Sequence, residues 1–367
     1  MNQSRLDTLA EMITKSDLAG VALNAGPSLT YFTGLNFHLM ERPVVFVFLP
    51  KSTPLLILPR LEAAKVSAVD GTDLFFYEEN PDEWPGVFAK ALYSIDISGK
   101  KLGVEPLGLR FIEYTLLQNG STNVQFTDCT KLISSLRGRK DEQEIAIMQK
   151  AVDIAESALR ATLPQVKRGM EEREIAAELV MQLFRHGSEP KLPFSPIVSG
   201  GPNGANPHAK PSTRKIGAGD LLVIDWGAAI DGYVSDLTRT FAVGEIDKES
   251  AKIHELVQEA NAAGRSAGVV GAACGDVDRA ARQVIEEAGY GKFFTHRTGH
   301  GIGKECHEEP YIRSDNKEIL VAGMTYTVEP GIYLPGKNGV RIEDDVLVTA
   351  EGPVSLSSLP RKIIQIG

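Results

Sequence analysis

Long apolar segments are missing from this sequence of 367 residues. The longest runs, such as PVVFVFLP at 43–50, are far too short to span a bilayer. The first residues lack a basic stretch followed by an apolar one, so we expect no signal peptide. Positive charge is also scarce, with 39 Lys and Arg against 48 Asp and Glu and a formal net charge of −9, which argues against a nucleic-acid partner. We therefore predict a protein that binds neither membrane nor nucleic acid.

Cysteine is rare as well, because the chain has only Cys129, Cys274 and Cys306. They are odd in number and form no CxxC pair, which indicates reduced thiols and a cytoplasmic location. Cys306 stands beside His307, so its thiol could act in catalysis. The alternative, which we favour, is a small side chain packed within the fold.

The whole chain is too long for one average domain, and its 43% hydrophobic and 24% charged residues predict a globular protein with an ample core.

The first 131 residues have the alternation of strands and helices that is typical of an α/β layer. Short apolar runs typical of strands alternate with helical spacing of apolar residues. The predicted strands cover 21–26, 43–50, 54–59, 73–79, 101–106 and 123–128. The predicted helices between them cover 4–17, 60–69, 84–96 and 109–119.

A charged segment, RGRKDE at 137–142, marks the change to a second domain. It leads into a long amphipathic helix, with Ile145, Met148, Ala151 and Ala155 on one side. We place the boundary near 131–138, which gives domains over 1–131 and 132–367.

The second domain repeats one order of elements. Asp231-Gly232 is a strong turn signal between two apolar strands and predicts a hairpin. The order helix, helix, hairpin appears twice, which predicts a pseudo-symmetric α+β domain with a site between its halves. The other predicted elements are helices over 171–186, 248–266 and 276–288 and strands over 324–329 and 339–347.

Four carboxylates and one imidazole stand in distinctive contexts, VIDWGA, VSDLTRT, RTGHGIG, TVEPGIY and RIEDD. Such a set can hold two divalent cations side by side, generate a metal-bound hydroxide and attack a carbonyl carbon. The five residues are Asp225, Asp236, His300, Glu329 and Glu343.

The hairpin predicts that two of these carboxylates lie close together. If 231–232 form the turn, residue 227 pairs with 236, and Asp236 points to the same face as Asp225. The two residues are then diagonal neighbours, roughly 7–8 Å apart, and metal–oxygen bonds could close that gap. Asp225 also interrupts an apolar run, where an unpaired carboxylate is costly. The alternative is two polar residues on a wet sheet face.

The remaining acids are weaker signals when each is taken alone. Glu329 ends a strand, and Glu343 lies in the last strand with Arg341 two positions earlier and so on the same face. Asp344 and Asp345 are expected to be solvated or to support a ligand, although either could compete with Glu343 for metal.

Histidines are concentrated in two places. Three of the seven stand within 296–307, in a glycine-broken segment, and His208 lies in ANPHAKP. By contrast, His254 is expected at the surface, and His186 ends a helix, where a cation suits the helix dipole.

Together these motifs resemble the proline-specific peptidases of the pita-bread fold, which are Xaa-Pro dipeptidases (prolidases) and aminopeptidase P. The resemblance covers the whole chain and implies an α+β protein, with an N-terminal creatinase-like α/β domain and a C-terminal pita-bread catalytic domain. It implies that Asp225 and Asp236 bind one metal, that His300 completes the ligand set of the other, and that Glu329 and Glu343 bind metal too. Asp236 and Glu343 would bridge the two ions. The residues that match the family's catalytic and supporting side chains are His208, His296, His307 and Arg341.

The implied reaction is hydrolysis of the Xaa-Pro peptide bond by a hydroxide that bridges two cations. Glu329 would take the proton as general base, while His208 and His307 would stabilise the oxyanion and bind the prolyl end. A carboxylate-rich site favours hard ions, so we expect Mn²⁺, with Co²⁺, Zn²⁺ or Fe²⁺ as alternatives.

Substrate length separates the two activities within the family. A prolidase cleaves dipeptides, whereas aminopeptidase P releases the first residue from longer peptides with proline second. Chain length and the HRTGHGIG form resemble small Xaa-Pro dipeptidases, which must also bind a free carboxylate with Arg297, Arg341 or an arginine of another subunit. Remote alternatives are a metal-free creatinase-like or binding relative, and methionine aminopeptidase. The complete ligand set argues against the former and the first domain against the latter.

The segment TGLNFHLMERP at 33–43 mixes polar residues with apolar ones. It could be a plain surface connection. The resemblance instead implies a homodimer in which the first domain of one subunit borders the catalytic pocket of the other. We then expect His38 or Arg42 to approach the partner's substrate, with Arg42 the better candidate because its fork can bind both oxygens of a carboxylate.

Overall fold

The computed structural model describes residues 1–67 and 69–367. The chain divides into two compact units, Met1–Arg137 and Gly138–Gly367. The first unit ends with α5 (Thr130–Arg137), which buries Ile133 in the core of that unit.

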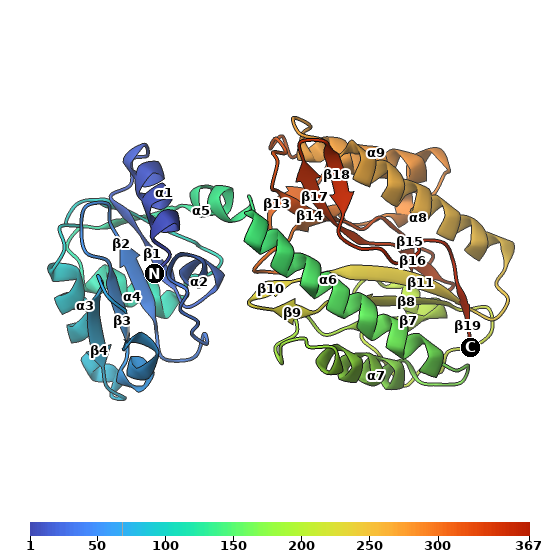
Figure 1. Cartoon of the computed structure of the whole chain (residues 1–367), viewed down its shortest axis with the longest axis horizontal. Coiled ribbons are helices and arrows are strands. Elements are labelled where there is room, and N and C mark those ends of the chain that lie inside the picture. Colours follow the sequence, from blue (N-terminus) through green and yellow to red (C-terminus); the bar gives the residue numbers. More distant parts are fainter. Residues whose placement is uncertain (68) are drawn as a thin grey trace. The chain divides into compact units, whose positions relative to one another are not determined.

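The first unit is a mixed sheet covered by helices on both faces (Figure 1). Its strand order is β4-β3-β2-β1-β5-β6, with β1 antiparallel to β2 and parallel to β5. The strands are β1 (Gly20–Asn24), β2 (Val45–Phe48), β3 (Leu55–Pro59), β4 (Asp73–Tyr77), β5 (Lys101–Val104) and β6 (Gln125–Asp128). The helices are α1 (Gln3–Thr14), α2 (Pro27–Thr33), α3 (Trp84–Tyr93), α4 (Phe111–Asn119) and α5.

Alternate side chains of the strands fill two separate cores. Val21 and Leu23 pack with α1, α2 and α5 on one face, whereas Ala22 packs with α3 and α4 on the other. Because both faces are covered, β1, β2 and β3 are buried along their whole length. All the predicted strands are present. The predicted helix over 60–69 is a 3₁₀ segment, η1 (Arg60–Val66), and residue 68 of that prediction lies outside the described residues.

The second unit places two helix pairs against two sheets (Figure 1). The pair α6 (Glu142–Thr162) and α7 (Glu172–Arg185) packs on the sheet β19-β11-β8-β7. The pair α8 (Lys248–Ala267) and α9 (Cys274–Glu287) packs against strands formed by residues 325–349. The predicted repeat of helix, helix and hairpin is therefore present.

The strands of the second unit form two larger sheets and two short ribbons. The second large sheet has the order β13-β12-β14-β17-β18, and the ribbons are β10-β9 and β15-β16. The strands are β7 (Ile197–Gly200), β8 (Leu221–Trp226), β9 (Ala229–Ile230), β10 (Tyr233–Val234), β11 (Leu237–Val243), β12 (Gly299–Gly301), β13 (Glu308–Ile312), β14 (Thr325–Val328), β15 (Gly331–Tyr333), β16 (Gly339–Arg341), β17 (Asp344–Thr349), β18 (Gly352–Ser355) and β19 (Gln365–Ile366). The further 3₁₀ segments are η2 (Pro81–Glu83), η3 (Leu163–Gln165), η4 (Gly201–Ala205) and η5 (Gly291–Phe293).

The long amphipathic helix predicted after the charged segment is α6, which buries Met148, Ala151 and Ala155 on one side. Residues 138–141, between α5 and α6, are not helical. Asp141 begins α6 with a capping box, because its carboxylate accepts from the amide of Glu144 at 2.8 Å and Glu144 accepts from the amide of Asp141 at 2.9 Å. In the part of the chain that the structure describes, no helix is long and apolar enough to cross a membrane.

Candidate metal centre

The hairpin at Asp231-Gly232 has the predicted register. Both turn residues have positive φ, 50° and 70°, as a tight two-residue hairpin turn requires. Ile230 pairs with Tyr233, and further along the ladder Asp225 pairs with Thr238. Residue 236 therefore lies opposite 227, diagonal to Asp225, as predicted. Both carboxylates are buried.

Glu343 lies beside these two carboxylates because it stands between two strands, β16 and β17, that the sequence predicted as one. The predicted strand over 339–347 is wrong as a single element, because β16 pairs with β15 whereas β17 pairs with β14 in another sheet. At the crossing, the amide of Glu343 donates to the carbonyl of Thr238 at 3.1 Å. The Thr238 hydroxyl donates to Glu343 Oε2 at 2.7 Å. Thr238 thereby joins Glu343 to the first hairpin.

Asp344 and Asp345 are not solvated, contrary to one predicted alternative, since both are fully buried. Burial raises the pKa of Asp344, but the charges and hydrogen bonds of Arg239 and Arg361 outweigh it and lower the pKa overall. Asp345 Oδ2 accepts the amide of Asp236 at 3.1 Å. Asp345 therefore fixes the backbone of a predicted ligand.

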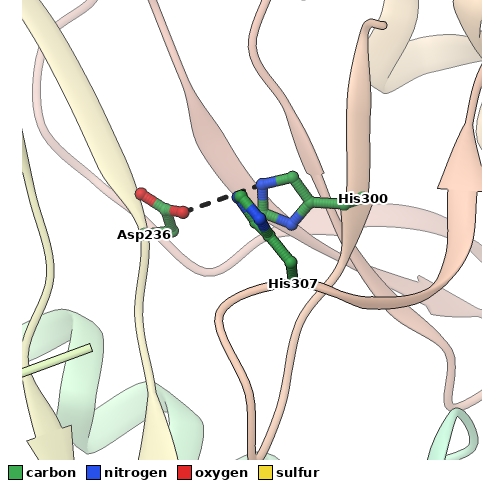
Figure 2. Close-up of side chains that lie close together, drawn as sticks. All are labelled: Asp236, His300 and His307. Atoms are coloured by element: carbon green, nitrogen blue, oxygen red, sulfur yellow. Dashed lines mark ion pairs between the residues drawn. The ribbon is translucent and has the colours of Figure 1, made fainter. Parts of the chain in front are cut away.

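His300 lies on β12, where glycines on both sides allow close approach to neighbouring backbone. A Cβ at Gly299 would lie 1.8 Å from the carbonyl oxygen of Thr327, and one at Gly301 would lie 2.3 Å from that of Glu309. Figure 2 shows the rings of His300 and His307 directed toward Asp236. His300 Nε2 lies 3.8 Å from Asp236 Oδ2.

Glu329 completes the set at the end of β14. Its Oε1 lies 3.4 Å from His300 Nε2. Its amide donates to the carbonyl of Thr298 at 2.7 Å, which places it beside β12. The structure thus brings all five predicted ligands together.

Three groups of side chains in this cluster could each hold an ion. Within each group the ligand atoms lie within 4.8 Å of one another. The groups are Asp225, Asp236 and Glu343; His300, Glu329 and Glu343; and Asp236, His300 and His307. Asp225 Oδ1 is buried and, among the described residues, has no hydrogen-bond partner. An orphaned carboxylate oxygen in an oxygen-rich cluster fits a divalent cation.

Burial makes the cluster costly to ionise without metal. Burial raises the pKa of Asp225. Burial and the negative charge of neighbouring carboxylates together raise the pKa of Asp236 and Glu343 well above their ordinary values. Burial raises the pKa of Glu329 to about 8. Burial also lowers the pKa of His300 well below its ordinary value, which leaves a neutral imidazole that can bind metal.

Metal binding should therefore release protons. The Glu329 pKa of about 8 lies above its ordinary 4.5, so this group is protonated at pH 7 without metal and must lose its proton to become a ligand. Because the folded pKa is raised, the metal-free protein loses stability as pH rises between these two values. Calorimetric titration with Mn²⁺ at pH 7, in buffers of different ionisation enthalpy, should show at least about one proton released. No release would contradict this assignment.

Arg341 connects the cluster to its surroundings. Its Nη2 donates to Asp225 Oδ2 at 2.5 Å and its Nη1 donates to the Tyr333 hydroxyl at 3.0 Å. Nη1 also donates to the carbonyl of Pro207 at 3.3 Å, which holds the segment that carries His208. Tyr333 is a member of this network that was not predicted from the sequence, although it follows Glu329 in the EPGIY segment.

The three predicted catalytic histidines lie in different environments. His208 and His307 are exposed, and the His307 ring centre lies 4.1 Å from that of His300. His296 has both ring nitrogens engaged, with the Arg297 carbonyl at 2.7 Å and the Tyr333 hydroxyl at 2.8 Å. His296 therefore belongs to a hydrogen-bond chain that runs through Tyr333 to Arg341. The exposed rings of His208 and His307 can contact a substrate.

Cys306 touches the cluster as a neutral thiol. Its Sγ donates to Asp236 Oδ2 at 3.0 Å. Burial and the charge of Asp236 raise the pKa of this thiol, which disfavours the nucleophilic thiolate. The packed side chain is thus favoured over the catalytic thiol.

His254 is not the surface residue that the sequence analysis expected. It is buried on α8, and burial lowers its pKa to about 4. His254 follows Ile253 on the buried face of α8, which also carries the polar residues Ser250 and Asn261, so residue polarity does not mark that face. His186 does end α7, as predicted, and its Nδ1 lies 2.8 Å from the carbonyl of Gln182.

Arg297 supplies a positive charge near the cluster. The guanidinium of Arg297 lies over the ring of Tyr311, 4.4 Å from its centre. Within residues 1–67 and 69–367 it makes no hydrogen bond or ion pair. After burial, its charge is the largest cause of the lowered pKa of His307, which places it close to that ring.

This fold and cluster are those of a known class of hydrolase. The sequence matches Metallopeptidase family M24 over residues 146–350 and the Creatinase/Prolidase N-terminal domain over residues 5–138. The chain therefore belongs to metallopeptidase family M24, a metal-dependent class of peptidase.

Relatives and solved structures match the chain along its whole length. The Xaa-Pro dipeptidase of Pyrococcus horikoshii is 33% identical over 367 residues, covering 99% of each chain. The prolidase from Thermococcus sibiricus matches with a TM-score of 0.93 and 34% identity, covering 100% of this chain and 99% of that one. The X-Pro aminopeptidase from Thermotoga maritima matches with a TM-score of 0.85 and 31% identity, covering 98% and 99%. The predicted creatinase-like and pita-bread architecture is confirmed.

Proposed function

We propose that this chain is an Xaa-Pro dipeptidase that uses two divalent cations, Mn²⁺ in the first instance. The observation that carries the proposal is the overlap of the ion-binding groups, because Asp236 and Glu343 each belong to two of them. Shared carboxylates suit two adjacent ions. The relatives named Xaa-Pro dipeptidase and prolidase support the substrate class.

The five ligands in this proposal are those that the sequence predicted. Asp225 and Asp236 would hold one ion, His300 and Glu329 would hold the other, and Glu343 and Asp236 would serve both. Two bound cations would activate a water and polarise the substrate carbonyl. Oxygen donors outnumber the single imidazole, which favours Mn²⁺ over the alternatives Co²⁺, Zn²⁺ and Fe²⁺.

The chain's own residues supply the remaining steps. Glu329, whose pKa is raised to about 8, is suited to accept the proton of the attacking water and pass it on near neutral pH. His208 and His307 are exposed beside the cluster and can donate to the oxyanion and the prolyl end. Arg341 orients Asp225 through its 2.5 Å hydrogen bond.

Arg297 supports the dipeptidase over the longer-substrate alternative. A dipeptide presents a free prolyl carboxylate. The Arg297 guanidinium, stacked on Tyr311 and without a carboxylate partner among the described residues, can bind it with both donors. An aminopeptidase P would have no such charge to bind. The match to the X-Pro aminopeptidase from Thermotoga maritima keeps that activity as the second candidate.

Substrate length tests the choice between these activities. Initial rates with Ala-Pro and with a longer peptide that begins Ala-Pro should favour the dipeptide strongly. Faster cleavage of the longer peptide would establish the aminopeptidase instead.

We further propose a homodimer in which the segment 33–43 approaches the partner's substrate. Leu39 and Met40 are exposed in this segment, at 52% and 48%, whereas Phe37 is buried in the first unit's core. The Arg42 guanidinium is engaged by Glu79 at 2.9 Å and by Glu41 at 2.7 Å. His38 is exposed and becomes the better candidate for the substrate.

Removal of His38 tests this arrangement. His38→Ala should raise KM for dipeptides several-fold more than for longer peptides, with metal content unchanged, because only the dipeptide carboxylate lies at its reach. Sedimentation at micromolar concentration should show a particle of about twice the 39.8 kDa chain. A monomer, or equal effects on both substrate lengths, would contradict the arrangement. Arg42→Ala serves as a matched comparison from the same segment.

A further inference from the structure

A buried ion pair lies at the base of the segment that carries His307. Lys140 Nζ lies 2.7 Å from Glu308 Oε1, and the two side chains are 2% and 7% exposed. Lys140 precedes α6 and is fixed there, because its amide donates to the carbonyl of Gly323 at 2.8 Å. Glu308 is the first residue of β13 and adjoins His307 in the chain. Neither charged residue belongs to the candidate metal groups.

The pair contacts both ends of residues 303–308, here named the His307 segment. A Cβ at Gly303 would lie 2.7 Å from Glu308 Oε1 and 2.7 Å from Lys140 Cε. Glycine at 303 therefore lets the ion pair press against the start of the segment while Glu308 forms its end. A displacement of the pair would be transmitted to both ends.

The segment is also held at the hairpin that carries Asp236. The amide of Val234 donates to the carbonyl of Gly303 at 2.9 Å, and Cys306 Sγ donates to Asp236 Oδ2 at 3.0 Å. Lys304 Nζ lies 4.0 Å from the ring centre of Tyr233. The His307 segment is thus fixed on one side by the hairpin and on the other by the ion pair.

The ion pair is a poor device for stability alone. Desolvation of two charges offsets most of their attraction, and well-packed apolar side chains of similar volume are often as stable. A charge pair does, however, require one specific placement of its two partners. Its benefit in this place is geometric.

We propose that Lys140 is a positioning residue for His307 and acts through Glu308. This inference rests on the proposed function, in which His307 meets the substrate. A shift of about 1 Å in a group that contacts the reacting atoms can reduce turnover about 10²-fold. Loss of the ion pair should therefore lower kcat without loss of metal.

The test replaces both partners, because removal of one alone would take the ion-pair partner from the buried charge of the other and destabilise the fold. Lys140→Met/Glu308→Leu should keep the wild-type metal content and melting temperature and lower kcat for Ala-Pro by about 10- to 100-fold. The control is Lys337→Met/Glu249→Leu, which removes an exposed ion pair from the same unit and should leave kcat unchanged. Wild-type turnover in a folded, metal-loaded Lys140 and Glu308 double variant would overturn the proposal.

A second arm identifies His307 as the residue through which the pair acts. In a His307→Ala background the same double replacement should change kcat by less than about twofold, because coupled residues are not additive. An undiminished loss in that background would overturn the proposal. If the double variant does not fold, Gly303→Ala replaces it, because the added methyl group displaces the ion pair without removing charge. This variant should lower kcat with metal retained and have little effect in the His307→Ala background. Any other result would contradict the proposal. A wild-type protein that cleaves no Xaa-Pro peptide would refute the proposed function separately.

Discussion

Asp236→Ala should abolish both hydrolysis and metal loading. This carboxylate belongs to two of the three ion-binding groups, so its loss removes an oxygen ligand from each proposed ion at once. We expect kcat to fall by at least about 10⁴-fold, the scale for loss of a residue on which a whole catalytic unit depends.

Folding can be separated from function in this experiment. Asp236→Asn keeps the shape of the side chain and one oxygen, and it should also lose metal while its melting temperature stays close to that of the metal-free wild type. Asp315→Ala, which removes an exposed carboxylate in the same unit, should change neither property. Wild-type turnover of Asp236→Ala with manganese would show that the site is wrongly assigned.

His307→Ala should give the opposite separation, with turnover lost and metal retained. The ring is exposed, lies beside His300 and points toward Asp236 (Figure 2), so it can contact a substrate bound at the ions. Loss of one oxyanion or proton-transfer partner typically costs about 10²–10³ in kcat.

The metal content of this variant decides between two roles. Full occupancy with reduced kcat supports the substrate-contacting role. Loss of metal would instead place His307 among the ligands, in the group with Asp236 and His300. His186→Ala, at the end of α7 in the same unit, is the matched control and should leave both properties unchanged.

The parts of the site that the sequence predicts are those governed by local rules. Asp231-Gly232 allows one tight turn, and that turn sets the register that brings Asp225 and Asp236 together. Short continuous apolar runs likewise predict the strands of the first unit, of which β1, β2 and β3 are buried on both faces of the sheet.

The parts that the sequence does not predict depend on contacts between distant segments. The run 339–347 has the composition of one strand. Its first part, β16, pairs with β15 in a two-stranded ribbon, whereas its last part, β17, pairs with β14 in the five-stranded sheet. Asp344 and Asp345 look like surface charges until Arg239, Arg361 and the amide of Asp236 are placed around them. Tyr333 and His254 are further cases, since neither has a local signal for the partners or the burial that the fold gives it.

The metal stoichiometry of the purified protein tests the central claim most directly. The chain should be loaded with Mn²⁺, freed of unbound metal and measured by elemental analysis against protein concentration. The overlap of the carboxylate groups predicts about two ions per chain, each with oxygen-rich coordination. Fewer than about one divalent ion per chain after loading would contradict the assignment of these residues as a dinuclear catalytic centre.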